Sequence, residues 1–189
     1  MNHPELLLIP IMMLLDYFLT VWGAVLSEKK YQHHFRIEHY ELNPIWQNCI
    51  TRKQWFNPKH LAIVTVVTVL CLWWSSAWTF RDNAMEGMFG FYTIFFASII
   101  GLHVSNIFIF NYLLRHPECV SGEVTMSHLL TLHMSRFRFL ALIFPMVLIS
   151  IFSPTPFVIG GVCSQIVLII INWVWTAKAK AKLRKQNPA

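Results

Sequence analysis

The sequence predicts an all-α integral membrane protein, a helical bundle with about five transmembrane helices. Three observations support this fold class. The chain has 189 residues, of which 56% are hydrophobic and only 13% charged, and its mean hydropathy is +0.50. Its apolar residues gather in runs long enough to span a membrane, which takes about 20 residues. Its basic residues lie almost entirely in alternate connecting segments, so one polytopic membrane domain, residues 1–189, is expected.

Five apolar segments define the expected helices. Four have full spanning length, whereas the fourth in chain order, residues 139–152, reaches it only if its helix begins near Arg136 or His133. The first segment follows no basic residue and precedes no small-residue cleavage site, so we interpret it as a retained span rather than a signal peptide. The expected spans cover approximately residues 6–26, 61–80, 88–114, 136–153 and 156–177.

The basic residues predict the orientation. Cytosolic segments are enriched in Lys and Arg, and with five spans and a cytosolic C-terminus all 15 basic residues except Arg81 fall on the cytosolic side. The N-terminus is then outside. This distribution explains the net charge of +6 without a nucleic-acid partner. We expect a protein of the bacterial inner membrane whose basic face meets anionic lipid headgroups.

The longest connecting segment, residues 27–60, is too short to bury a core of its own. Asn43 and Pro44 form an N-cap followed by proline, which predicts a short amphipathic helix at the membrane surface. Asn57 is expected to cap the second span. A further amphipathic stretch, residues 125–137, is expected to lie on the inner surface and to bend into the fourth span.

One acidic residue lies inside the first apolar run. Asp16, Thr20, Gly23 and Ser27 recur at spacings of four, three and four residues, so they form one small and polar stripe. Such a stripe faces other helices rather than lipid. A carboxylate inside a membrane costs about 3 kcal/mol or more unless it is protonated, paired or hydrated, so Asp16 is the first candidate for a functional site.

The third span carries a second polar stripe. His103 and Asn106 share one helical face, and Gly101 and Ser105 form a neighbouring row of small residues that lets another helix approach closely. The same row suits contacts between protomers, so a homo-oligomer is a further expectation.

Depth along the helices relates these residues to one another. At about 1.5 Å per residue, Asp16 and His103 both fall about 15 to 17 Å from the cytosolic boundary. Gln165 on the fifth span and Cys71 on the second fall at a similar depth. The sequence therefore predicts one layer that holds an acid, an imidazole, an amide and a thiol. The candidates for binding an ion or a proton are Asp16, Thr20, His103, Asn106 and Gln165.

Two interpretations of Asp16 stay open. In the functional one, Asp16 and His103 form a buried pair that shares a proton or a bound cation, since an acid beside a titratable imidazole suits proton transfer. In the structural one, a protonated Asp16 hydrogen-bonds a neighbouring helix and fixes its register. The functional interpretation has more weight because intramembrane acids so often mark functional sites.

Histidines also gather near the expected cytosolic boundary. The group consists of His33, His34, His39, His60, His128 and His133, with Glu41. Imidazole and carboxylate suit zinc, copper or iron, but the spacing matches no metal motif, and histidines at a basic membrane surface are the favoured interpretation. His103, His128 and His133 are the weak candidates for metal ligands, and no cofactor is assigned.

Glu41, Asn43 and Pro44 form a Glu-x-Asn-Pro sequence. It can act as a helix cap alone, or Glu41 and Asn43 can dock under the bundle and close the path to Asp16. With Asp16 and Thr20, it resembles small uncharacterised multi-span bacterial membrane proteins whose first helix carries Asp and Thr and is followed by Glu-x-Asn-Pro. The resemblance covers about the first quarter of the chain. It implies one site for these residues but no activity.

Three functions are compatible with this pattern. The first is transport or conduction of a cation or proton at Asp16 and His103. The second is an intramembrane enzyme that processes a lipid or isoprenoid, with Asp16, His103 and Glu41 as acid-base groups or metal ligands. The third is a non-catalytic partner in membrane assembly. The sequence has no P-loop, nucleophile elbow or metalloprotease motif, so nucleotide-driven chemistry is not expected, whereas other enzymatic activity stays open.

Overall fold

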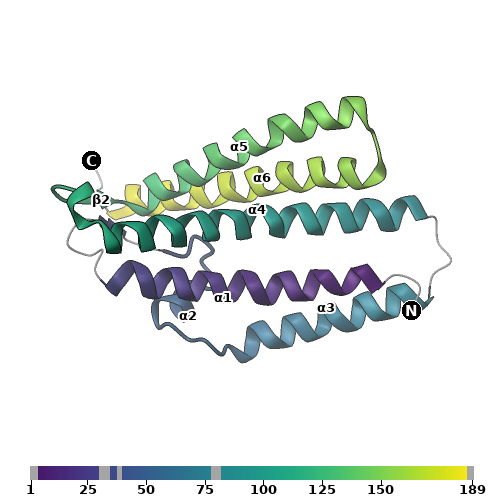
Figure 1. The fold of residues 1–189 in the computed structure, drawn as a ribbon, viewed down its shortest axis with the longest axis horizontal. Helices are drawn as coiled ribbons and strands as arrows, with labels where there is room; N and C mark the ends of the chain where they lie inside the picture. Colours follow the sequence, from purple (N-terminus) through teal and green to yellow (C-terminus); the bar gives the residue numbers. More distant parts are fainter. Residues whose placement is uncertain (1–3, 30–34, 38–39, 78–81, 187–189) are drawn as a thin grey trace.

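The computed structural model describes residues 4–29, 35–37, 40–77 and 82–186. It is all-α, with 84% of its residues in helices. Figure 1 shows the helices running lengthwise beside one another. In chain order the elements are η1 (Pro4–Leu7), α1 (Leu8–Lys29), β1 (Phe35–Ile37), α2 (Gln47–Thr51), α3 (Pro58–Ala77), α4 (Asp82–Arg115), η3 (Pro117–Cys119), β2 (Val124–Met126), α5 (His128–Phe152) and α6 (Pro156–Gln186).

Four helices are long and apolar enough to cross a membrane. They are Pro4–Glu28, Asn83–Arg115, His128–Phe152 and Pro156–Leu183. Large apolar side chains such as Phe108, Phe144 and Ile151 are exposed on them, as lipid-facing surfaces require. The apolar part of α3, Pro58–Trp74, is shorter. The predicted all-α class is confirmed, with four helices that are long and apolar enough to span a membrane.

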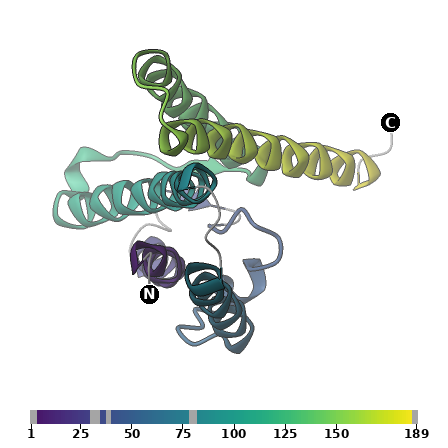
Figure 2. The same cartoon turned by 90° about the vertical axis from the view of Figure 1, so that its right-hand side faces the viewer.

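Helix α4 is the centre of the bundle. It packs against α1 on one side and against α6 on the other, while α5 packs on α6 and α3 lies beside α1 (Figures 1 and 2). Among the long helices, α1 and α6 therefore make the extensive contacts with α4. Residues placed on opposite faces of α4 belong to different interfaces.

The interface between α4 and α6 depends on glycine. A Cβ atom on Gly160 would overlap the carbonyl oxygen of Gly87, and one on Gly90 would overlap that of Phe157. The two backbones are thus in direct contact, the packing that small residues allow between membrane helices. Gly101, in contrast, has no atom of the described residues within 4 Å of an added Cβ, so no helix described here packs closely on this position of the predicted row of small residues.

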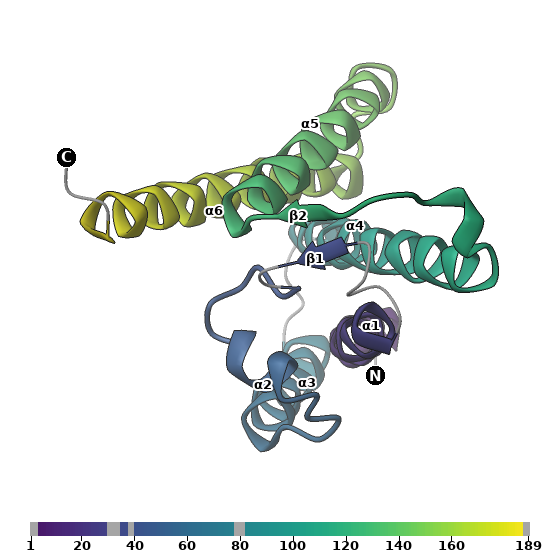
Figure 3. The ribbon, with the colours of Figure 1, turned by 90° about the vertical axis from the view of Figure 1, so that its left-hand side faces the viewer.

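The connection before α5 differs from the expectation. Residues 125–137 were expected to lie on the inner surface and to bend into the fourth span, but α5 is one helix from His128 onward. The Ser127 hydroxyl accepts a hydrogen bond from the Leu130 N–H at 3.3 Å and caps it. Thr125 belongs to β2, which pairs in parallel with β1 (Figure 3). The residues expected to form the first helical turn, from Thr125, therefore form backbone pairs with β1 instead.

Two asparagine caps determine the segment between β1 and α3. Asn43 Oδ1 accepts from the Ile45 N–H at 3.0 Å, but this opens a turn, and the α-helix that follows is only α2, of five residues. Asn57 Oδ1 accepts from the Lys59 and His60 N–H groups at 3.0 and 3.4 Å and starts α3 as predicted. His33, His34, His39 and Arg81 lie outside the described residues.

Candidate functional site

The structure brings Asp16 and Thr20 of α1 together with His103 of α4. Asp16 Oδ1 lies 3.2 Å from His103 Nε2, and Thr20 Oγ1 lies 3.0 Å from the same nitrogen. Thr20 is 4% exposed, and the side chains of Asp16 and His103 are 25% and 16% exposed. The stripe on α1 and the stripe on α4 thus meet at one buried point of the α1–α4 interface.

The hydrogen bonds assign a proton to His103 Nε2. Thr20 has one hydroxyl proton, and it donates this proton to the Asp16 carbonyl oxygen at 2.8 Å. Its contact with His103 therefore requires the Nε2–H group as the donor. His103 Nδ1 is buried and has no hydrogen bond within the part of the chain that the structure describes. A second proton there would be buried without an acceptor, so this arrangement favours a neutral imidazole.

Asp16 is left without a full counter-charge. Its Oδ1 atom is buried and accepts no hydrogen bond from the described residues. In the same part of the chain, His103 is the group that meets Asp16 at ion-pair distance, while Lys53 pairs with Glu28 and His116 with Glu118. A buried carboxylate with a neutral imidazole as its neighbour is stabilised by a proton or a cation.

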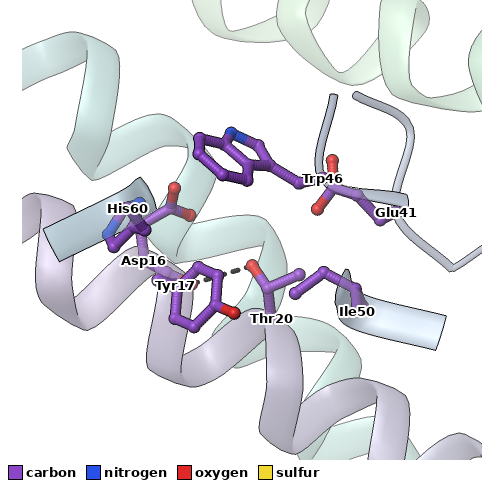
Figure 4. A pocket seen from close by; sticks show the side chains of 7 residues that line it. All are labelled: Asp16, Tyr17, Thr20, Glu41, Trp46, Ile50 and His60. Carbon is purple, nitrogen blue, oxygen red and sulfur yellow. Dashed lines mark hydrogen bonds between the residues drawn. The ribbon is translucent and has the colours of Figure 1, made fainter. Parts of the chain in front are cut away.

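Asp16 and Thr20 also line a pocket. The pocket encloses about 30 Å³, and the empty space there is about 240 Å³ when the adjoining open solvent is included. Figure 4 shows the carboxylates of Asp16 and Glu41 on two sides of it, with the Trp46 ring between them in this view. The lining residues are Asp16, Tyr17, Thr20, Glu41, Trp46, Ile50 and His60.

Glu41 stands at this pocket on the segment before α2. Its Oε1 accepts a hydrogen bond from the Asn43 N–H at 2.6 Å. Burial raises the pKa of Glu41 to about 7, although the hydrogen bond from the Asn43 N–H opposes the rise. The Glu-x-Asn-Pro sequence therefore serves as a cap and also places an acid beside Asp16 that titrates near neutral pH.

The wall of the pocket opposite Glu41 comes from the start of α3. His60 stacks on Tyr17 with ring centroids 4.5 Å apart, and the Trp46 ring meets His60 edge-on at 5.6 Å. Tyr17 also donates a hydrogen bond to the Gln54 carbonyl oxygen at 2.7 Å. These contacts hold the segment before α3 against the middle of α1.

The stacking of Tyr17 and His60 corrects the predicted layer. Because His60 is the third residue of α3, Asp16 is level with the beginning of α3, although α1 continues for thirteen residues beyond Asp16. Cys71 lies far from this level, in a cluster with Leu6 and Ile9. The prediction that Cys71 shares the layer is therefore wrong, since packing and not span length sets the offset of α3.

Gln165 is also outside the Asp16 layer. It is fully buried, and its Nε2 donates to Ser98 Oγ at 2.7 Å on the face of α4 that packs against α6. Ser98 and His103 are five residues apart, which turns them about 140° from each other around the helix. The structure thus separates Gln165 from the candidates Asp16, Thr20 and His103.

Asn106 lies one turn beyond His103 and contacts another helix. Its Oδ1 accepts from Arg138 Nη1 on α5 at 3.4 Å. Tyr40 stacks near His103, with ring centroids 6.5 Å apart, and a Cβ on Gly23 would overlap its hydroxyl. Burial raises the pKa of Tyr40, so its phenol stays neutral. Gly23 of the predicted stripe therefore makes room for the loop and not for a helix.

The metal candidates are not brought together. Among the described residues, no group of three or more His, Cys, Asp or Glu side chains is arranged to hold a metal ion. His133 contacts Arg136 within α5, whereas His103 contacts Asp16 on α1. His103, His128 and His133 therefore do not form a shared site in this structure.

The site also differs from a hydrolase triad. In such a triad the acid and the hydroxyl nucleophile contact opposite nitrogens of the histidine. Here Asp16 and Thr20 approach the same Nε2 atom, and the Thr20 proton is directed to a carbonyl oxygen. Activation of Thr20 as a nucleophile has no geometric support.

Four pocket residues were not among the site candidates: Tyr17, Trp46, Ile50 and His60. They come from a helix flank, a turn, a short helix and a helix start, so no single periodicity connects them. The sequence did contain one indication of this packing, since a glycine in a polar stripe, such as Gly23, indicates that another segment comes close to the helix at that position. Here the segment is the loop that carries Tyr40. Comparison of the chain with protein-family models, with curated proteins and with solved structures gave no match.

Proposed function

We propose that this chain is a membrane transport protein that takes up a proton or a small cation at Asp16 and His103. The observation that carries the proposal is the contact of 3.2 Å between Asp16 and the imidazole, beside a pocket with a second acid, Glu41. The Asp16 carboxylate has a neutral neighbour and an unbonded oxygen, so binding a positive charge offsets its burial.

The topology of the proposal follows from the basic residues. All five long helices span the membrane, with the N-terminus outside and the C-terminus in the cytosol, because this arrangement keeps the basic segments inside. The segment around α2 then lies at the cytosolic surface, where the exposed Ile45, Trp55 and Phe56 enter the lipid interface. Lys59 and Arg52 meet anionic headgroups there, as in a bacterial inner membrane.

With this topology the site opens to the cytosol. Asp16 is level with the start of α3, so it lies near the inner boundary rather than at the membrane centre. Toward the outside, the α1–α3–α4 interface is apolar, with Leu6, Ile9, Cys71 and Met85 buried in one cluster. A continuous pore is not supported by this packing. We therefore favour transport by binding and release over open conduction.

Proton flux into liposomes tests the proposal. Purified protein is reconstituted with a pH-sensitive dye inside, and flux is followed after an imposed pH gradient and potential. Asp16→Asn keeps the size of the side chain but removes its charge, so flux is expected to fall at least about tenfold. The control is Glu86→Gln, which removes an exposed carboxylate elsewhere on α4. Equal flux in wild type and Asp16→Asn would refute the proposal.

A further inference from the structure

The pocket beside Asp16 has the opposite charge to its surroundings. The chain has a net charge of +6, and the segment that forms the pocket carries Arg52 and Lys53. Yet neither lysine nor arginine lines the pocket, whose ionisable groups are Asp16, Glu41, Tyr17 and His60. An acidic cavity inside a basic protein selects for a cationic ligand.

Apart from the hydroxyl-bearing Thr20, the remaining lining is aromatic and aliphatic. Trp46 and Tyr17 contribute rings and Ile50 contributes an alkyl group. An inorganic cation needs a shell of oxygen or nitrogen ligands, and no three acidic, histidine or cysteine side chains of the described residues are placed to hold a metal ion together. Aromatic rings instead attract organic cations through their negative faces. The lining thus favours a nitrogen cation over a metal ion.

Two polar atoms at the pocket residues have no hydrogen bond within the described chain. One is Asp16 Oδ1, and the other is Nε2 of His60, a residue only 9% exposed. A buried polar atom without a partner is costly. Acceptors of this kind suit a ligand that brings several N–H donors.

From this lining we infer that the pocket binds a small organic ammonium ion, with its N–H groups toward Asp16 and Glu41 and its alkyl group against Trp46 and Ile50. The enclosed volume of about 30 Å³ is far below the roughly 300 Å³ at which drug-sized pockets begin, so the ligand has few heavy atoms. The inference rests on the proposed function, because it names the chemical class of the cation.

Equilibrium dialysis of radiolabelled methylammonium against the purified protein in nanodiscs tests the inference. Wild type is expected to bind about one ion per chain, and Glu41→Gln to weaken binding at least about tenfold through loss of a charge partner. Trp46→Leu is expected to weaken it about threefold to thirtyfold, the range of one cation–π contact. Trp46→Phe, which keeps a ring, is expected to stay within about threefold of wild type. Glu86→Gln serves as the charge control.

Three results would overturn the inference. These are absence of saturable methylammonium binding to wild type, equal binding in Trp46→Leu and wild type, and displacement of methylammonium by an equal concentration of sodium. Proton flux measured without any amine separates this inference from the proposed function. Flux that depends on Asp16 without methylammonium binding refutes the organic ligand alone, whereas binding without such flux refutes transport.

Discussion

The two faces of α4 are built in opposite ways. Toward α6, glycines bring the backbones into contact, so that Gly160 has no room for even one methyl group. Toward α1, the same helix presents His103 to a buried acid beside a pocket. The first face is a close-packed scaffold, and the second retains space and unbonded polar atoms. The face of α4 toward α6 thus fixes the position of the helix, and the face toward α1 contributes His103 to the site.

The largest effect on stability is expected at the glycine face. Gly160→Ala places a methyl group against the backbone of α4, which cannot move aside as a side chain can. We expect a loss of about 2 kcal/mol, seen as a melting temperature lower by about 4 to 8 °C in thermal unfolding. Gly101→Ala adds the same group in open space and is the control. Equal losses in both variants would contradict a tightly packed α4–α6 face.

A smaller effect is expected where the loop meets α1. Gly23→Ala overlaps the Tyr40 hydroxyl, but a side-chain tip can shift, so the loss is expected to be about 1 kcal/mol. Tyr40→Leu removes the overlapping group. In that background Gly23→Ala should cost nothing further, which a double-mutant cycle of unfolding free energies measures. Additive losses would show that Tyr40 does not rest on Gly23.

The pH dependence of stability distinguishes the site face from the scaffold face. The pKa of Glu41 is about 7 in the folded chain against an ordinary value of 4.5, so the folded state prefers the protonated acid. This contribution is fully present below about pH 4.5 and is lost as the pH rises through about 7. In a buffer without amines, the melting temperature should therefore fall as the pH rises from about 5 to about 8. Glu41→Gln should abolish this slope, and an unchanged slope would assign it to another group.

The smallest effect is expected at Gln165. Gln165→Leu loses the hydrogen bond to Ser98, but it also removes a buried oxygen that has no partner among the described residues. The net change in unfolding free energy should stay within about 1 kcal/mol, and proton flux should match wild type. His103→Leu, in contrast, should reduce flux at least about tenfold. Similar flux in the two variants would remove the functional difference between the faces of α4.

The long helices are predictable from this sequence because apolar runs of spanning length have few other structures available. The meeting of Asp16 and His103 was also accessible, since each residue lies on a polar stripe and the two helices pack along most of their length. Counting residues from span ends failed for Cys71 and Gln165. Their positions depend on how far α3 is shifted along α1 and on which face of α4 packs against α6, and side-chain packing decides both.

The pocket could not be predicted as a whole. Trp46 and Ile50 reach it through a turn and a helix of five residues, whose conformation depends on docking against α1. Strands of three residues such as β1 and β2 have too little periodicity to detect. The Glu-x-Asn-Pro sequence did indicate a joint site with Asp16, because its asparagine fixes the turn beside which Glu41 lies.

The short ladder between β1 and β2 limits how far the acid at the pocket can travel. Glu41 follows Ile37, the last residue of β1, by only four positions, so their Cα atoms are at most about 14 Å apart. Since β2 joins α4 to α5, the ladder acts as a short tether from the connection of the central helix to Glu41. Any withdrawal of this acid beyond that radius must first separate the two strands, which couples access to the site to the position of α5.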